Sequence, residues 1–307
     1  MANVAISAPD PKAQADGSRR ASGSAYLFLL PWILGVLLLT ILPMATSLYL
    51  SFTRYFLGTD PQFIGLTNYQ RILDDPAFAR TSWVTIRYVF ISVPLQLVFA
   101  LGIAVVLNRG LRGLALYRSI YYLPSLLGGS VAVAVLWRQL FASNGVIPAI
   151  AGYFGITMGS WISDPRHALD TLIILNVWTF GSPMVIFLAA LRQIPGELLE
   201  AAKVDGAGAI TRFFWITLPL ITPVIFFNLV LQVIGTFQAF TPAYIVSNGS
   251  GGPADSTLFY TLYLFQVGFQ EFDMGYASAL AWVLFLVIGV LTAINFVVSR
   301  YWVHYEN

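Results

Sequence analysis

The side chains that could do chemistry in this 307-residue chain are few, and their spacing does not form a catalytic site. Histidine occurs only as His167 and His304, in no His-Glu-x-x-His arrangement, and the chain has no cysteine. These observations exclude a zinc site of that type, a thiolate metal site and a thiol nucleophile. Ser, Asp and His cannot be paired into a triad from their spacing. The sequence therefore predicts no catalytic residue, no metal and no cofactor bound by this chain.

Amide, hydroxyl and aromatic side chains instead recur at helical spacing inside two apolar stretches. Asn228, Gln232 and Thr236 are spaced i, i+4, i+8, and Asn176 and Phe180 are spaced i, i+4. Polar groups at membrane depth usually face a bundle interior or an aqueous cavity. Amides can bond hydroxyl groups and an aromatic ring can stack on the apolar face of a sugar. Two interpretations stay open: a solute pathway, or hydrogen bonds between helices.

The composition places these stretches in a membrane. Hydrophobic residues make up 58% of the chain and charged residues 10%, and the mean hydropathy is +0.76, whereas a soluble domain carries roughly a quarter charged residues. The net charge of +2 comes from scattered residues, so nucleic acid is not an expected partner. A helix needs about 20 apolar residues to cross a bilayer. We expect an all-α polytopic membrane protein with about six spans, at residues 26–50, 84–107, 119–141, 170–191, 219–240 and 277–299.

The chain divides into a short polar tail and one membrane domain. Residues 1–24 are too poor in apolar side chains to fold alone, which predicts a disordered tail. Residues 25–307 are predicted to form the transmembrane domain, with a structured loop at 192–218. The first apolar run is longer than a signal-peptide core, so we expect it to stay in the mature protein.

Lys and Arg are distributed unevenly between the loops, which predicts the orientation because positive loops stay on the cytoplasmic side. One set of loops contains ten: Lys12, Arg19, Arg20, Arg109, Arg112, Arg118, Arg192, Lys203, Arg212 and Arg300. The other set contains Arg54, Arg71, Arg80 and Arg166, and residues 241–276 contain none. Both termini are therefore expected in the cytoplasm.

No phosphate-binding Gly-x-x-x-x-Gly-Lys-Ser/Thr motif is present, so this chain is not expected to hydrolyse nucleotides. All fourteen Asp and Glu residues lie in the predicted tail, loops or span edges. The absence of an acidic residue at mid-span argues against a proton-coupled carrier. A secondary transporter or channel that acts without ATP stays the alternative to a carrier driven by a separate ATPase.

The loop at 192–218 has an unusual pattern for a connector. Strong helix formers follow Pro195, Gly206 permits a sharp turn, and an amphipathic segment then leads to Pro219, which predicts helix, turn, helix. Paired alanines beside a glycine leave little side-chain bulk, so another protein could approach the backbone closely. A rim of Glu200, Lys203, Asp205 and Arg212 would give such a contact specificity. The alternative is an interfacial helix that rests on the bilayer.

The same loop resembles a known motif. Glu200-Ala201-Ala202, then Gly206, then Ile216 and Leu218-Pro219 match the spacing of the EAA loop of binding-protein-dependent ABC importer permeases. Further stretches look like the carbohydrate-type members related to the maltose system: Trp161-Ile162-Ser163-Asp164-Pro165, Phe187-Leu188-Ala189-Ala190-Leu191, Gly251-Gly252-Pro253 and Gly275-Tyr276-Ala277-Ser278-Ala279-Leu280. The resemblance covers most of the chain except the polar tail.

The resemblance implies that the loop forms a coupling helix in a groove of a cytoplasmic ATPase. The implied contact residues are Glu200, Ala201, Ala202, Asp205 and Gly206, and Asp205 could instead cap the second helix. Solute contacts in the resembling family come from the two helices that flank this loop.

The resemblance also implies an assembly in the bacterial cytoplasmic (inner) membrane. Its members would be a second, different permease subunit, two ATPase subunits that bind ATP and Mg, and an extracytoplasmic solute-binding protein. The solute itself is not determined, because an amide-lined cavity suits monosaccharides, oligosaccharides, polyols and glycerol phosphodiesters alike.

Overall fold

The computed structural model describes residues 28–108, 113–155 and 159–303. The predicted tail, residues 1–24, lies outside the described residues. The predicted all-α class is confirmed: the described chain is almost entirely helical and its one sheet has two strands of two residues each.

Four helical segments are long and apolar enough to cross a membrane, or up to six if each of two bent pairs is counted as one span. The four are Phe28–Ser51, which includes the π-turn η1 (Leu37–Ile41) and α2 (Leu42–Ser51); α4 (Pro76–Leu107); α8 (Ala168–Trp178) with α9 (Gly181–Gln193); and α16 (Met274–Trp302). The bent pairs are α5 (Leu114–Leu127) with α6 (Val131–Leu140), and α11 (Ala209–Arg212), η3 (Phe213–Thr217) and α12 (Leu218–Leu220) with α13 (Thr222–Phe237). The six predicted spans thus correspond to these segments, two of them sharply bent.

Short elements connect the long ones. They are β1 (Thr53–Arg54), β2 (Gln62–Phe63), α3 (Thr67–Asp74), α7 (Val146–Tyr153), η2 (Trp161–Ser163), α10 (Gly196–Val204), α14 (Thr241–Val246), η4 (Pro253–Asp255), α15 (Tyr260–Phe265) and η5 (Gln266–Gln270). β1 and β2 pair antiparallel, with Thr53 opposite Phe63. Residues 241–276, which the sequence suggested were only a loop, contain α14 and α15.

The bend between α5 and α6 has a local cause. Gly128 and Gly129 interrupt the helix, and α6 restarts after Ser130, whose hydroxyl accepts a hydrogen bond from the Val133 amide at 3.3 Å. The two helices meet at 95°. Only glycine fits at 128, because a Cβ there would lie 2.0 Å from Thr179 Cγ2. The bend therefore serves close packing against the α8–α9 segment.

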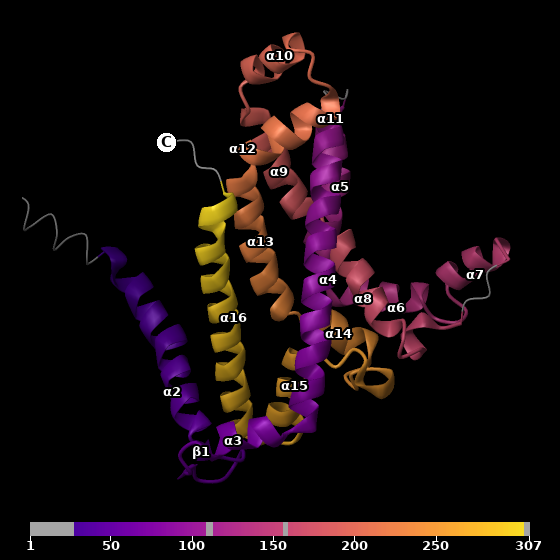
Figure 1. Ribbon diagram of the computed structural model, residues 1–307. Helices are drawn as coiled ribbons and strands as arrows, with labels where there is room; N and C mark the ends of the chain where they lie inside the picture. The colour runs from indigo at the N-terminus through magenta and orange to yellow at the C-terminus, as the bar shows by residue number, and fades with distance from the viewer. Residues whose placement is uncertain (1–27, 109–112, 156–158, 304–307) are drawn as a thin grey trace, which may run out of the picture.

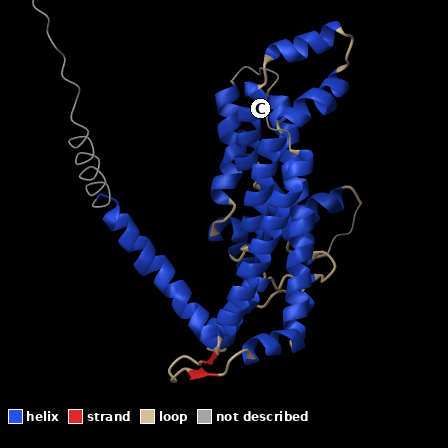
Figure 2. Ribbon diagram, turned by 60° about the vertical axis from the view of Figure 1, so that its left-hand side comes forward, coloured by secondary structure: helices blue, strands red, loops and turns tan. Residues whose placement is uncertain are grey.

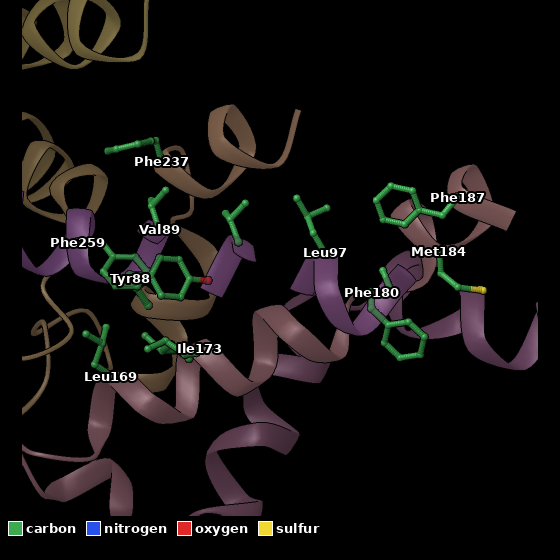
Figure 3. Packing of buried hydrophobic residues seen from close by; sticks show 14 of the residues in the cluster. Tyr88, Val89, Leu97, Leu169, Ile173, Phe180, Met184, Phe187, Phe237 and Phe259 are labelled. Carbon is green, nitrogen blue, oxygen red and sulfur yellow. The ribbon is translucent and has the colours of Figure 1, made fainter. Parts of the chain in front are cut away.

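α4 is the central helix of the bundle. Its residues Ala100 and Ala104 are fully buried, which allows α9 to approach closely, and the Tyr88 ring lies 4.5 Å from the Phe259 ring. Figure 3 shows side chains of α4, α8 and α9 in one apolar cluster, with labelled members Tyr88, Val89, Leu97, Leu169, Ile173, Met184 and Phe187. The core thus fixes the position of α8 and α9 relative to α4.

The first long helix stands apart from this core. None of the residues in the apolar window of Phe28–Ser51 is buried, and α2 contacts α16. Figure 2 shows the segment diverging from the bundle toward its amino-terminal end. Most of its surface is left to lipid or to another subunit.

The two ends of the bundle carry different elements. Figure 1 places α10 and α11 at one end, together with the last described turn of α16, and places α3 and β1 at the other. The last turns of α9, α10 and α16, at the α10 end, contain Arg192, Lys203 and Arg300, whereas β1 and α3 at the other end contain Arg54 and Arg71. This separation follows the two sets of loops defined by the sequence.

Polar contacts tie the α3 end together. Asp75 accepts hydrogen bonds from the Tyr263 hydroxyl, from the Tyr276 hydroxyl at 2.7 Å and from the Ala77 amide at 2.9 Å. Arg71 pairs with Asp273 at 2.7 Å, and its guanidinium carbon lies 3.9 Å from the centre of the Tyr276 ring. We call these five residues, Arg71, Asp75, Tyr263, Asp273 and Tyr276, the α3-end network. It joins α3, α4, α15 and α16.

Candidate functional site

A cavity of about 410 Å³ lies where the broken helices meet. It borders the α5–α6 bend, the break between α8 and α9, and the end of α13. Its lining is rich in amides and hydroxyls and includes no charged residue. The lining residues are Tyr88, Gln96, Ser125, Gly128, Gly129, Leu175, Asn176, Thr179, Ser182, Gln232, Gly235, Thr236, Gln238, Ala239, Phe240, Thr241 and Pro242.

Thr179 is the centre of the polar wall. It ends α8, so its carbonyl has no helical partner and accepts instead from Gln96 Nε2 at 3.2 Å and from Ser125 Oγ at 2.7 Å. Its hydroxyl accepts from Gln96 Nε2 at 3.0 Å and donates to the Asn176 carbonyl at 2.7 Å. Ser125 Oγ also accepts from the Ser182 amide at 2.9 Å. The break between α8 and α9 is therefore held by side chains of α4 and α5.

Three of the five predicted pathway residues line this cavity: Asn176, Gln232 and Thr236. They come from α8 and α13, the segments on either side of the α10 loop, which the fold brings to one space. A solute contact for them stays a prediction.

Phe180 and Asn228 lie outside the lining. The Phe180 ring is buried and packs against Phe99 and Tyr121, at 4.8 and 5.9 Å between ring centres. Asn228 is buried and donates to the Val224 carbonyl of its own helix at 3.0 Å. For these two residues, the geometry supports packing and an internal hydrogen bond rather than a place on the cavity wall.

The sequence reasoning missed Gln96, Ser125 and Gln238, which also line the cavity. Gln96 and Ser125 lie inside predicted spans, so the rule that singled out Asn176 could have found them. Their helices are remote from the α10 loop in sequence, and only the packing brings them beside α8.

α10 projects from the end of the bundle (Figure 1), and none of its residues is buried. Val204 is 88% exposed. The helix ends in a tight turn: Gly206 adopts φ +83°, its amide bonds the Lys203 carbonyl at 3.1 Å, and the Ala207 amide bonds the Ala202 carbonyl at 2.9 Å. These two bonds form a Schellman motif, in which the left-handed position favours glycine. The predicted helix, turn and second helix are present.

The suggestion that Asp205 caps the second helix is wrong. α11 begins after Gly208 and has no side-chain cap, because the turn at Gly206 places three residues between Asp205 and the helix start. Asp205 instead ends α10. Of the other rim residues, Arg212 is directed back to α10, since its Nη1 donates to the Leu199 carbonyl at 3.4 Å.

Within the described ranges, no group of three or more His, Asp and Glu side chains could hold a metal ion. His167 stacks on Trp161 with ring centres 5.0 Å apart, and its Nδ1 lies 3.4 Å from Asp170 Oδ2. The features that can act are thus the uncharged cavity and the exposed α10 loop.

Comparison with known proteins bears on both features. Residues 76–303 match the model of the family described as binding-protein-dependent transport system inner membrane component. The chain belongs to this family. The match includes every residue that lines the cavity and the whole α10 loop.

Relatives of this inner membrane component are permease proteins. This chain is 53% identical to the probable ABC transporter permease protein YesP of Bacillus subtilis (strain 168), over 94% of this chain and 94% of YesP. It is 33% identical to the lactose transport system permease protein LacF of Rhizobium radiobacter, over 90% and 94% of the two chains. It is 32% identical to the trehalose/maltose transport system permease protein MalF of Thermococcus litoralis, over 92% and 95%.

A solved structure shares the fold of this inner membrane component. A chain of a bacterial alginate ABC transporter, solved in complex with an alginate pentasaccharide-bound periplasmic protein, matches with a TM-score of 0.80 at 21% identity. The match covers 92% of this chain and 96% of that chain. The likeness confirms the helical permease fold predicted by the resemblance.

Proposed function

We propose that this chain is a transmembrane permease subunit of an ATP-driven importer and moves a sugar or sugar-like solute into the cytoplasm. The observation that carries this proposal is a 410 Å³ cavity walled by amides and hydroxyls, between the helices that flank an exposed loop. Neutral donors and acceptors suit hydroxyl-rich solutes. The lactose and trehalose/maltose permeases among the relatives support a saccharide.

The α10 loop is proposed to couple this cavity to a separate ATPase. Glu200, Ala201, Ala202, Asp205 and Gly206 would form the contact, with the small residues permitting close approach and the charges giving specificity. α9 runs into α10, and α11 leads through η3 and α12 into α13, so a displacement of the loop would move both flanking segments. ATP and Mg would be bound by the ATPase subunits.

The complete importer is proposed to contain a second, different permease subunit, two ATPase subunits and an extracytoplasmic solute-binding protein. The unburied helix Phe28–Ser51 offers the second permease a surface. The assembly would lie in the bacterial inner membrane with both termini of this chain in the cytoplasm, as the uneven Lys and Arg distribution favours.

Transport in proteoliposomes tests the proposal. With all partner subunits present, we expect uptake of a ¹⁴C-labelled saccharide such as lactose or trehalose to require ATP inside the vesicles. The chain alone should carry no flux. Flux through the chain alone without ATP would instead establish a channel or secondary carrier.

Cysteine labelling tests the orientation, because the natural chain contains no cysteine and gives no background. Val204 in the α10 loop and Tyr153 at the end of α7 are 88% and 93% exposed, which makes them a matched pair. In intact cells, a membrane-impermeant maleimide should label Tyr153→Cys and spare Val204→Cys. The reverse pattern would place α10 outside the cell and refute the coupling role.

A further inference from the structure

Two buried polar atoms without a partner belong to residues that line the cavity. Within the described part of the chain, five buried side-chain atoms lack a hydrogen-bond partner: Ser92 Oγ, Gln96 Oε1, Arg118 Nε, Asn176 Nδ2 and Ser256 Oγ. Of their residues, Gln96 and Asn176 line the 410 Å³ cavity. A buried polar group without a partner keeps its full desolvation penalty, so its presence needs a reason. The pair consists of one acceptor and one donor.

The packing fixes the acceptor in place. Gln96 is 2% exposed, and its Nε2 is held by both the carbonyl and the hydroxyl of Thr179, at 3.2 and 3.0 Å. The amide cannot turn without losing these bonds, so Oε1 cannot find another partner by rotating. Asn176 is joined to the same point through its backbone, because the Thr179 hydroxyl donates to its main-chain carbonyl at 2.7 Å. Thr179 therefore links the Gln96 side chain to the α8 backbone at Asn176.

We propose that Gln96 is a solute-binding residue whose Oε1 accepts a hydrogen bond from a solute hydroxyl, while Asn176 Nδ2 donates one. This inference rests on the proposed function. Hydroxyl groups both donate and accept, so a polyhydroxy solute satisfies both amides, whereas an apolar solute satisfies neither. Gln96 lies on α4, outside the segments that flank the α10 loop, so the site includes the central helix of the core as a third wall.

The chain offers a matched control one turn away. Ser92 is also on α4, is fully buried and carries an unpartnered oxygen, but it does not line the cavity. Removing its hydroxyl should leave transport unchanged, because no solute contact is lost. A general requirement for buried polar groups on α4 would affect both positions.

The test uses the complete importer in proteoliposomes with ¹⁴C-lactose and ¹⁴C-trehalose as probes, and measures saccharide taken up per ATP hydrolysed. In Gln96→Met, which keeps the side-chain length, we expect this ratio to fall about tenfold while the rate of ATP hydrolysis changes less than about twofold. In Ser92→Ala both quantities should match the natural protein. If Gln96→Met fails to assemble, Gln96→Asn, which withdraws the amide by one methylene, should lower the ratio about fivefold.

Each other outcome overturns the inference in a recognisable way. An unchanged ratio in the assembled Gln96 variant would show that this amide does not contact the solute. Equal loss of uptake and ATP hydrolysis would assign Gln96 a structural role through Thr179. If the natural protein carries neither probe, the proposed saccharide function fails, and this inference fails with it.

Discussion

The two ends of the bundle are stabilised in opposite ways. At the α3 end, Asp75 accepts hydrogen bonds from Tyr263 and Tyr276, and Arg71 pairs with Asp273, so four helices are joined by side chains within the chain. At the α10 end, no residue of α10 is buried, and a 3.4 Å hydrogen bond from Arg212 to the Leu199 carbonyl joins α11 to α10. The polar groups of the α3 end are thus paired within the chain, whereas the residues of α10 remain exposed.

This difference predicts that the α3 end mainly affects the stability of the fold, and the α10 loop mainly affects coupling to the ATPase. Charges paired inside the chain contribute to the fold of the isolated subunit, whereas exposed side chains contribute little to it. The α10 loop keeps its shape through backbone bonds of the turn at Gly206, which leaves Glu200 and Asp205 available to a partner. We therefore expect substitutions at the α3 end to alter unfolding, and those in the α10 loop to alter uptake.

The largest effect is expected from Gly206→Val. The position has φ +83°, which a β-branched residue resists strongly, so the turn should be lost and uptake abolished. The amount of protein in the membrane should not change, because nothing packs within 4 Å of a Cβ at Gly206. Uptake and copurification with the ATPase measure the effect.

Gly208→Val is the control for this substitution. Gly208 lies in the same loop with open space around its Cβ and an ordinary φ of −66°. It should retain most of the uptake. Equal loss in both variants would show that the conformation of the turn at Gly206 is not what matters.

Asp75→Ala should cause the largest loss of stability. The substitution removes the cap of α4 and leaves the hydroxyls of Tyr263 and Tyr276 without an acceptor, at a combined cost of about 2–4 kcal/mol. Thermal unfolding of the purified chain in detergent measures it. The exposed neighbour Asp74→Ala should change the midpoint little, and an equal shift in both would contradict the network.

The stability of the protein should also depend on pH through the Asp75 carboxylate. Burial raises the pKa of Asp75, but hydrogen bonds from Tyr263, Tyr276 and backbone amides outweigh it, so the pKa lies below its ordinary value. A depressed folded pKa contributes stability that is present above the unfolded value and is lost as pH falls through the folded one. From about pH 6 to about pH 3, the unfolding midpoint should therefore fall more in the natural protein than in Asp75→Asn. Parallel pH curves would contradict this.

The smallest effect is expected from Asp205→Ala. Because α11 begins at Ala209, after Gly208, and has no side-chain cap, losing this carboxylate should change the free energy of unfolding by less than about 0.5 kcal/mol. Uptake should decrease if Asp205 contacts the ATPase. A stability loss of about 1 kcal/mol, typical of a removed cap, would instead indicate that Asp205 caps α11.

Local patterns predicted the features that depend on local causes. The spans follow from apolar length, and the turn at Gly206 follows from the need for a positive φ. Asn176, Gln232 and Thr236 could be selected because polarity at membrane depth is informative at a single residue. The capping role given to Asp205 failed because a helix start can shift by a few residues within a glycine-rich turn.

The sequence by itself determined a helical membrane protein with a structured, exposed loop between two spans, since hydropathy, proline, glycine and charge act within one or two turns of chain. Only the tertiary structure decided that Gln96 and Ser125 meet at Thr179, and that Phe180 and Asn228 do not line the cavity. The reason is physical: which face of a helix meets a cavity depends on how α5, α8, α9 and α13 pack around α4, and that packing is set by contacts between residues far apart in the chain.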